Sequence, residues 1–111
     1  ENVYLIVGII GDKAATGYKR QPIYNQEMRQ ILIESCKYVD QVLIDPPLIV
    51  TEKFIKEYKI DYVVHGFANK SDLEKQKDFF EVPLKLDKML TVEYNHGIST
   101  TDIINKIKEN Y

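Results

Sequence analysis

A nearly continuous run of apolar residues near the start of the chain constrains the fold more than any other feature. Residues 3–10, VYLIVGII, combine Val, Ile and Leu with hardly any polar side chain. Such a run suits a strand covered on both faces, as the strands of parallel sheets are. Gly11, Asp12 and Gly17 follow and indicate a loop directly after this strand.

The rest of the chain alternates between helical and strand-like patterns. Asn25 and Thr51 are suitable N-caps, and apolar residues recur at helical spacing after each of them. A third helix is predicted over residues 99–110, and its apolar side chains are expected to face inward: Ile103, Ile104 and Ile107.

Three further strands are predicted between these helices. Residues 41–44 form a short strand that Asp45-Pro46-Pro47 stops. Residues 60–64 form a buried strand, and residues 88–94 alternate enough to form another. Residues 67–87 are interpreted as a solvated loop or a short surface helix. The alternation of strands and helices predicts the α/β class with a mostly parallel sheet.

In such a sheet, ligands bind outside the carboxyl ends of the strands. Four segments follow the predicted strands, and we expect them to converge on one rim: residues 11–19, 45–50, 65–69 and 94–102.

Composition narrows the functional class. The chain of 111 residues suits a single domain, residues 1–111, and its net charge of −2 argues against a nucleic-acid binder. Cys36 is the lone cysteine, so an internal disulfide is impossible, which fits a reducing compartment. It is interpreted as a packed core thiol. The longest apolar run is far too short to cross a bilayer.

Three consecutive hydroxyl residues open the last predicted helix. Ser99, Thr100 and Thr101 are followed by Asp102 and preceded by Gly97. The amino end of a helix presents free N–H groups and a positive dipole end, which favour an anion. Hydroxyls add donors for phosphate oxygens. A phosphate site and a redundant cap with solvated threonines are about equally supported by the residues alone.

Other candidate residues are less specific. Lys19 lies after the first strand and could neutralise a polyphosphate, although a surface lysine is the simpler interpretation. His65 ends a predicted strand and could contact a base or phosphate, although a structural role is favoured. No metal-binding cluster is evident, because Asp12 and Asp61 are too isolated to be interpreted as ligands.

Five segments together resemble the eukaryotic phosphocholine and phosphoethanolamine cytidylyltransferases, in the same order and over nearly the whole chain. The closing segment, residues 94–104, is the most specific of them from Gly97 to Ile104. The segments are YLIVGIIGD (4–12), YKRQPIYNQEMR (18–29), CKYVDQVLIDPP (36–47), IDYVVHG (60–66) and YNHGISTTDII (94–104).

The resemblance implies a Rossmann-like nucleotidyltransferase fold and a CTP site. Lys19 is implied to hold the CTP phosphates and is the catalytic candidate. The hydroxyl residues are implied to face the triphosphate, with Mg²⁺ travelling with the nucleotide and no metal held by protein ligands. The implied CTP-binding residues are Gly8, Asp12, Lys19, Arg29, His65, Gly66, Gly97, Ile98, Ser99, Thr100, Thr101 and Asp102.

The chain departs from the family pattern in three respects. The family's His-x-Gly-His motif lies before the first strand seen here and is absent. Tyr94, Asn95 and His96 stand where the closing motif has an arginine, a threonine and an acidic residue. No paired aspartates follow His65.

The loss of the arginine and of the paired aspartates, the stretch QPIYN (21–25) and the turn at Val82-Pro83 resemble the second of the two tandem domains in phosphoethanolamine cytidylyltransferases. The expected reaction is transfer of CMP from CTP to phosphoethanolamine, giving CDP-ethanolamine and pyrophosphate for phospholipid synthesis. A phosphocholine-specific domain and a non-catalytic, degenerate nucleotide-binding copy remain the alternatives; an adenylyltransferase is least favoured. We expect a tandem pseudo-dimer or homodimer in the cytoplasm, with association at the endoplasmic reticulum membrane left open.

The resemblance also implies that a central strand and its helix are missing. Buried ladder groups left unpaired cost about 1–3 kcal/mol each, which is comparable to the stability of a small domain. We therefore expect this chain to fold poorly alone, to be inactive by itself, and to be completed by an N-terminal segment of the same protein.

Overall fold

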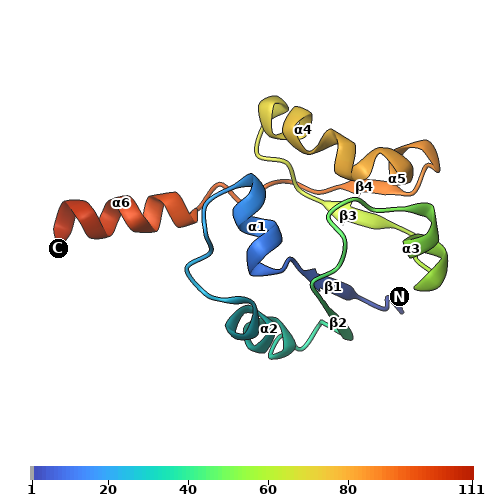
Figure 1. Ribbon diagram of the computed structural model, residues 1–111, viewed down its shortest axis with the longest axis horizontal. Coiled ribbons are helices and arrows are strands. Elements are labelled where there is room, and N and C mark those ends of the chain that lie inside the picture. The colour runs from blue at the N-terminus through green and yellow to red at the C-terminus, as the bar shows by residue number, and fades with distance from the viewer. Residues whose placement is uncertain (1) are drawn as a thin grey trace. The chain divides into compact units, whose positions relative to one another are not determined.

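The computed structural model describes residues 2–111 and alternates short strands with helices (Figure 1). This arrangement confirms the predicted α/β class. No helix within residues 2–111 is long and apolar enough to span a lipid bilayer. The elements are β1 (Ile6–Ile9), α1 (Asp12–Tyr18), α2 (Gln26–Glu34), β2 (Gln41–Ile44), α3 (Glu52–Glu57), β3 (Val63–His65), α4 (Lys70–Gln76), the 3₁₀ helix η1 (Lys77–Phe80), α5 (Glu81–Lys85), β4 (Met89–Thr91) and α6 (Thr100–Asn110).

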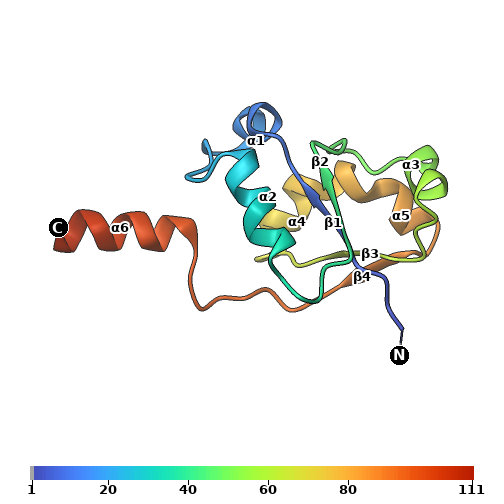
Figure 2. The same ribbon diagram turned by 90° about the horizontal axis from the view of Figure 1, so that it is seen from below.

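The chain divides into two compact units, and the first extends to Leu48. Its strands β1 and β2 pair in parallel, with Ile6 opposite Gln41 and Ile9 opposite Ile44. Both ribbon views show the two strands side by side (Figures 1 and 2). Helix α2 packs against this pair. The strand predicted over residues 41–44 is confirmed.

The second unit comprises residues 49–111 and contains the other parallel pair. Strands β3 and β4 pair with Val63 opposite Met89 and His65 opposite Thr91. The chain passes from β3 to β4 through α4, η1 and α5 (Figure 1). The described residues form two separate two-stranded sheets instead of one sheet. Strands β1 and β3 are each paired along one edge only.

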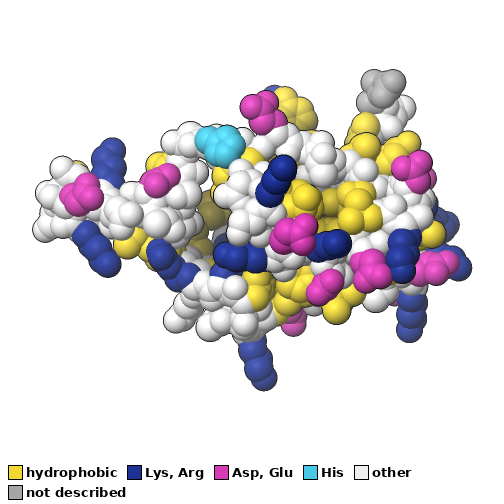
Figure 3. Space-filling view, turned by 90° about the horizontal axis from the view of Figure 1, so that it is seen from above, with side chains coloured by type: hydrophobic (Ala, Val, Ile, Leu, Met, Phe, Trp, Pro, Cys, Tyr) yellow, Lys and Arg dark blue, Asp and Glu magenta, His cyan; other side chains and the backbone are white. Residues whose placement is uncertain are grey.

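Few side chains are buried within residues 2–111. The buried apolar residues are Ile9, Ala15 and Ile55, together with Pro83 of α5. Many apolar side chains are exposed, and the space-filling view shows such side chains in yellow at the surface (Figure 3).

Three burial predictions are therefore wrong for the described residues. Val64, at the centre of β3, is 52% exposed although its strand was predicted to be buried. Ile103 and Ile107 of α6 are about half exposed rather than facing inward, at 45% and 53%. Cys36 is exposed rather than packed in a core. Each pattern indicates an apolar face, but burial also requires a second surface that covers it.

The helix starts were predicted better than the segments between elements. Asn25 caps α2 by accepting a hydrogen bond from the backbone N–H of Met28, and Thr51 caps α3 in the same way. The prediction of a loop directly after β1 is wrong, because helix α1 begins at Asp12. Residues 67–87 are largely helical, so the surface-helix alternative holds for α4, η1 and α5.

Two short helices end in the same left-handed turn without a glycine. Lys59 follows α3 with φ 52° and Asp87 follows α5 with φ 55°. After α3, the N–H of Ile60 donates to the carbonyl of Ile55; after α5, the N–H of Lys88 donates to that of Pro83. These bonds define a Schellman motif, which satisfies carbonyl groups left free at a helix end.

We expect Ile55→Ala to destabilise the second unit by about 2–5 kcal/mol, because it removes a fully packed side chain and leaves a cavity. Ile55 is 3% exposed, whereas Ile49 in the same unit is 52% exposed and provides the control variant Ile49→Ala. Urea denaturation followed by circular dichroism measures both. Equal losses in the two variants would contradict the burial described for α3.

Candidate functional site

In the first unit, the carboxyl ends of β1 and β2 meet in a crowded junction. A Cβ atom on Gly8 would lie 2.8 Å from Cγ of Pro46, and a Cβ atom on Gly11 would collide with the carboxylate of Asp45. Asp45 adopts a left-handed conformation with φ 51° and donates its N–H to the carbonyl of Ile9 over 2.8 Å. The two glycines therefore allow the chain after β2 to pass directly over β1.

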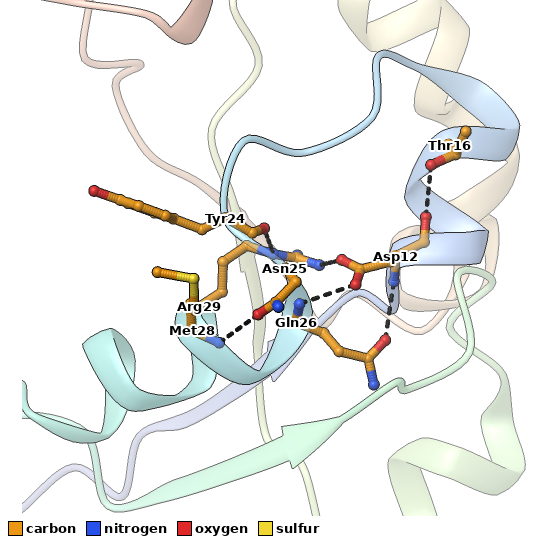
Figure 4. A network of polar contacts seen from close by, with 7 residues as sticks. All are labelled: Asp12, Thr16, Tyr24, Asn25, Gln26, Met28 and Arg29. Carbon is orange, nitrogen blue, oxygen red and sulfur yellow. Dashed lines mark hydrogen bonds and ion pairs between the residues drawn. The ribbon is translucent and has the colours of Figure 1, made fainter.

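A polar network joins the first residues of α1 and α2 (Figure 4). The N–H of Asp12 donates to Oε1 of Gln26 over 3.0 Å, and the N–H of Gln26 donates to Oδ2 of Asp12 over 3.1 Å. Each side chain thus satisfies a free N–H group at the start of the other helix. Nη2 of Arg29 lies 2.7 Å from Oδ1 of Asp12 and completes the network.

The loop between α1 and α2 carries the predicted lysine. The N–H of Lys19 donates to the carbonyl of Ala15 over 3.0 Å, which closes the last turn of α1. Its Nζ atom lies 5.2 Å from the ring centre of Tyr18, and the side chain is exposed. Lys19 makes no ion pair within residues 2–111. Its charge is therefore available to an anion from solution.

In the second unit, His65 ends β3 beside aromatic rings. Its ring centre lies 4.7 Å from that of Phe67 and 4.8 Å from that of Phe80, and the two phenylalanine rings are 5.8 Å apart. A Cβ atom on the next residue, Gly66, would lie 3.3 Å from the carbonyl oxygen of Val92. His65-Gly66 therefore lies against the segment that follows β4.

The segment before α6 forms a local turn. The N–H of Gly97 donates to Oδ1 of Asn95 over 2.9 Å, and the rings of Tyr94 and His96 are 5.1 Å apart. Ile98 is exposed. Where the resembled family has an arginine, this chain thus has an aromatic ring paired with a histidine.

The amino end of α6 has a complete capping box. Ser99 Oγ accepts the N–H of Asp102 over 3.1 Å, and Oδ2 of Asp102 accepts the N–H of Ser99 over 3.1 Å. The hydroxyls of Thr100 and Thr101 make no hydrogen bond within residues 2–111, and both residues are exposed. One hydroxyl residue therefore serves as the cap, and two hydroxyl groups remain available to a ligand.

The predicted site residues thus fall into two groups, one in each unit. Four of them lie in the first unit: Gly8 on β1, Asp12 at the start of α1, Lys19 just after α1 and Arg29 on α2. The other predicted site residues lie in the second unit. Sequence reasoning missed Gln26 and Phe80, and it placed Asp45 and Phe67 only within the segments expected at the rim, without a role for either. No local pattern marks these residues, because each meets its partner through the packing of separate elements.

No group of three or more His, Cys, Asp or Glu side chains within residues 2–111 is arranged to hold a metal ion. Asp12 is already engaged by Arg29 and by the backbone of Gln26. Within the described residues, the carboxylate of Asp12 is therefore part of the polar network and not of a metal-binding cluster.

Comparison with known proteins gives consistent matches. The family described as cytidylyltransferase-like matches residues 1–106. Choline-phosphate cytidylyltransferase 2 of Arabidopsis thaliana is 32% identical over 111 residues, covering 99% of this chain. The choline-phosphate cytidylyltransferase of Saccharomyces cerevisiae is 34% identical over 110 residues, also covering 99%. The ethanolamine-phosphate cytidylyltransferase of Arabidopsis thaliana is 30% identical over 107 residues, covering 93%. The matches cover 36%, 26% and 25% of these relatives.

Ser99→Ala should loosen the first turn of α6, because it removes the acceptor for the N–H of Asp102. Loss of an N-cap costs about 0.5–2 kcal/mol, which corresponds to roughly 2–30-fold faster exchange of that amide hydrogen. Thr101→Val keeps the cap and serves as the control. Amide exchange read by NMR distinguishes them, and equally fast exchange in both variants would argue against the capping box.

Proposed function

The chain belongs to the cytidylyltransferase-like family, and we propose that it forms part of an enzyme that transfers CMP from CTP to phosphoethanolamine. The observation that carries this proposal is the amino end of α6. Ser99 and Asp102 cap this end of the helix. The exposed hydroxyls of Thr100 and Thr101 have no partner within residues 2–111.

The chemistry of this helix end suits the phosphates of CTP. The first turn presents backbone N–H groups and the positive end of the helix dipole, and two hydroxyls add donors beside them. The carboxylate of Asp102 is held by the N–H of Ser99, which satisfies one of its oxygens. The proposal places phosphate oxygens against Thr100 and Thr101, with Gly97 and Ile98 forming the approach.

Lys19 supplies the second part of the proposal. An ammonium group acts as a compact point charge and suits the β- and γ-phosphates, where most of the negative charge of CTP lies. The exposed, ion-pair-free side chain within residues 2–111 supports this role. His65 and Gly66 are proposed to lie beside the nucleotide, with the histidine ring held by its phenylalanine neighbours.

In the proposed reaction, a phosphate oxygen of phosphoethanolamine attacks the α-phosphorus of CTP. A new P–O bond forms, the bond from the α-phosphorus to the bridging oxygen breaks, and that oxygen leaves with pyrophosphate. No covalent intermediate on the protein is required, so the protein's contribution is positioning and stabilisation of charge. Mg²⁺ would be carried by the phosphate oxygens of CTP, because this ion commonly enters such sites bound to substrate phosphates.

The preference for phosphoethanolamine over phosphocholine rests on two departures from the family pattern. Tyr94 stands where the family's closing motif has an arginine, and Phe67-Ala68 follow His65-Gly66 where paired aspartates would stand. Both differences resemble the second domain of ethanolamine-type enzymes. Relatives named for each of the two substrates match at similar identity, so phosphocholine is kept as the alternative substrate.

Unpaired strand edges support the proposal that a further strand completes the sheet. The N–H groups of Gln41 and Asp45 donate to the carbonyls of Leu5 and Ile9, respectively. The backbone N–H and C=O groups of the odd-numbered residues of β1 therefore point toward β2. Since alternate residues of a parallel strand face opposite neighbours, the backbone groups of Ile6 and Gly8 point the other way. They have no partner within residues 2–111.

Val64 of β3 also has backbone groups that point away from its paired strand. The bonds of Val63 and His65 run toward β4, which leaves the backbone groups of Val64 without a partner within the described residues. Its apolar side chain is also half exposed. We propose that another segment of the protein supplies an apolar parallel strand to the open edge of β1, and that the edge of β3 is likewise paired in the complete protein.

Lys19→Met in the full-length protein should weaken CTP binding by about 10–100-fold, because a charge-assisted contact is worth roughly 1.5–3 kcal/mol. Thr100→Val and Thr101→Val should each weaken it by about 2–10-fold, as expected for a neutral hydrogen bond. Lys53→Met removes an exposed charge from α3 and is the control. Calorimetric titration with CTP measures all four variants.

Pyrophosphate release completes this test. Release with phosphoethanolamine and not with phosphocholine supports the proposed substrate, and the reverse supports the alternative. Binding of CTP without release by either substrate would indicate a non-catalytic nucleotide-binding copy. Unchanged CTP affinity in the Lys19 and threonine variants would overturn the assignment of this site.

The edge of β1 is tested separately in the full-length protein. If a strand pairs there, the amide hydrogens of Ile6 and Gly8 should exchange as slowly as the paired amide of Asp45. The amide of Arg20, which lies in the exposed loop, gives the fast reference. Exchange of Ile6 and Gly8 at the rate of this reference would show that the edge remains open.

A further inference from the structure

The polar network of Asp12, Gln26 and Arg29 occupies groups that the family resemblance assigns to CTP binding. Nη2 of Arg29 lies 2.7 Å from Oδ1 of Asp12, and Nε of Arg29 donates to the carbonyl of Tyr24 over 3.0 Å (Figure 4). Both oxygens of Asp12 also accept hydrogen bonds, one from Arg29 and one from the backbone of Gln26. The network is therefore largely satisfied without a ligand.

The charges of this pair also cancel locally. A triphosphate approaching Arg29 would meet the carboxylate of Asp12 at the same place, and the two opposite charges together exert little net attraction on an anion. The side chains are 24% and 39% exposed, so neither is fully withdrawn from water. What the pair supplies is a fixed geometry rather than a free positive charge.

That geometry sets both ends of the loop between α1 and α2. Lys19 is fixed at the beginning by its N–H bond to Ala15, and Tyr24 is fixed at the end by Arg29. Between them, residues 20–23 make no hydrogen bond with any described residue. The conformation of the loop, and with it the position of Lys19, therefore depends on these two anchors.

We propose that Asp12, Gln26 and Arg29 are positioning residues that hold the loop carrying Lys19, and that they do not themselves touch the nucleotide. This inference rests on the proposed function, because it assigns Lys19 a phosphate to bind. Within it, Arg29 fixes Tyr24, Asp12 orients Arg29, and Gln26 ties the start of α1 to the start of α2.

Amide exchange without any nucleotide tests the positioning itself. Arg29→Gln in the full-length protein should speed exchange of the amides of residues 19–24 by roughly tenfold, since the loop loses the anchor at Tyr24. Arg29→Lys should do the same, because an ammonium group cannot reproduce the planar fork that reaches two acceptors. Arg20→Gln removes a loop charge without removing an anchor and should leave exchange unchanged.

A double-mutant cycle tests the route to CTP. If Arg29 acts through Lys19, Arg29→Gln should weaken CTP binding by about three- to tenfold in the parent protein and by less than twofold beside Lys19→Met. Circular dichroism confirms that each variant folds, and Asp12→Asn replaces Arg29→Gln if that variant does not. It should show the same coupling, because it weakens the orientation of Arg29.

The outcomes distinguish the positioning role of Arg29 from the proposed binding of CTP. Additive losses with unchanged loop exchange would place Arg29 directly on the nucleotide and overturn the inference. Failure of the parent protein to bind CTP would overturn the proposed function, whereas the exchange rates of the loop would still report whether Arg29 anchors it.

Discussion

Parallel backbone pairing is the interaction on which the rest of the described structure depends. The β1–β2 ladder brings Gly8, Gly11 and Asp45 to one junction, and the β3–β4 ladder brings His65-Gly66 to the segment after β4. Each ladder joins segments that are distant in the sequence, and the loops that follow them inherit their positions. Parallel pairs also require crossover connections, which the intervening helices provide.

Local signals explain which parts of the fold could be predicted from the sequence. Asn25 and Thr51 start helices because a side-chain oxygen and a following apolar stripe are both readable in a few residues. The helix at Asp12 was missed because two nearby glycines suggested a loop. The exposure of Val64 and Ile103 could not be predicted, because a pattern identifies an apolar face but not whether another surface covers it.

The candidate site shows the same division. The family resemblance singled out both Asp12 and Arg29, yet it gave no sign that the two side chains bind each other. Their pairing depends on how α1 and α2 meet, as does the participation of Gln26. The hydroxyl run before α6 is different, because its role as a cap and its surplus of hydroxyls both follow from neighbouring positions in the sequence.

The capping box also bears on the thermodynamics of association. Ser99 and Asp102 cap the first turn of α6 by themselves, so this turn is helical before an anion binds. A ligand meeting such a preorganised terminus spends little of its interaction free energy on ordering the backbone. Its heat-capacity change would then reflect the surface that it covers, as for rigid partners, and not the coupled folding of a helix.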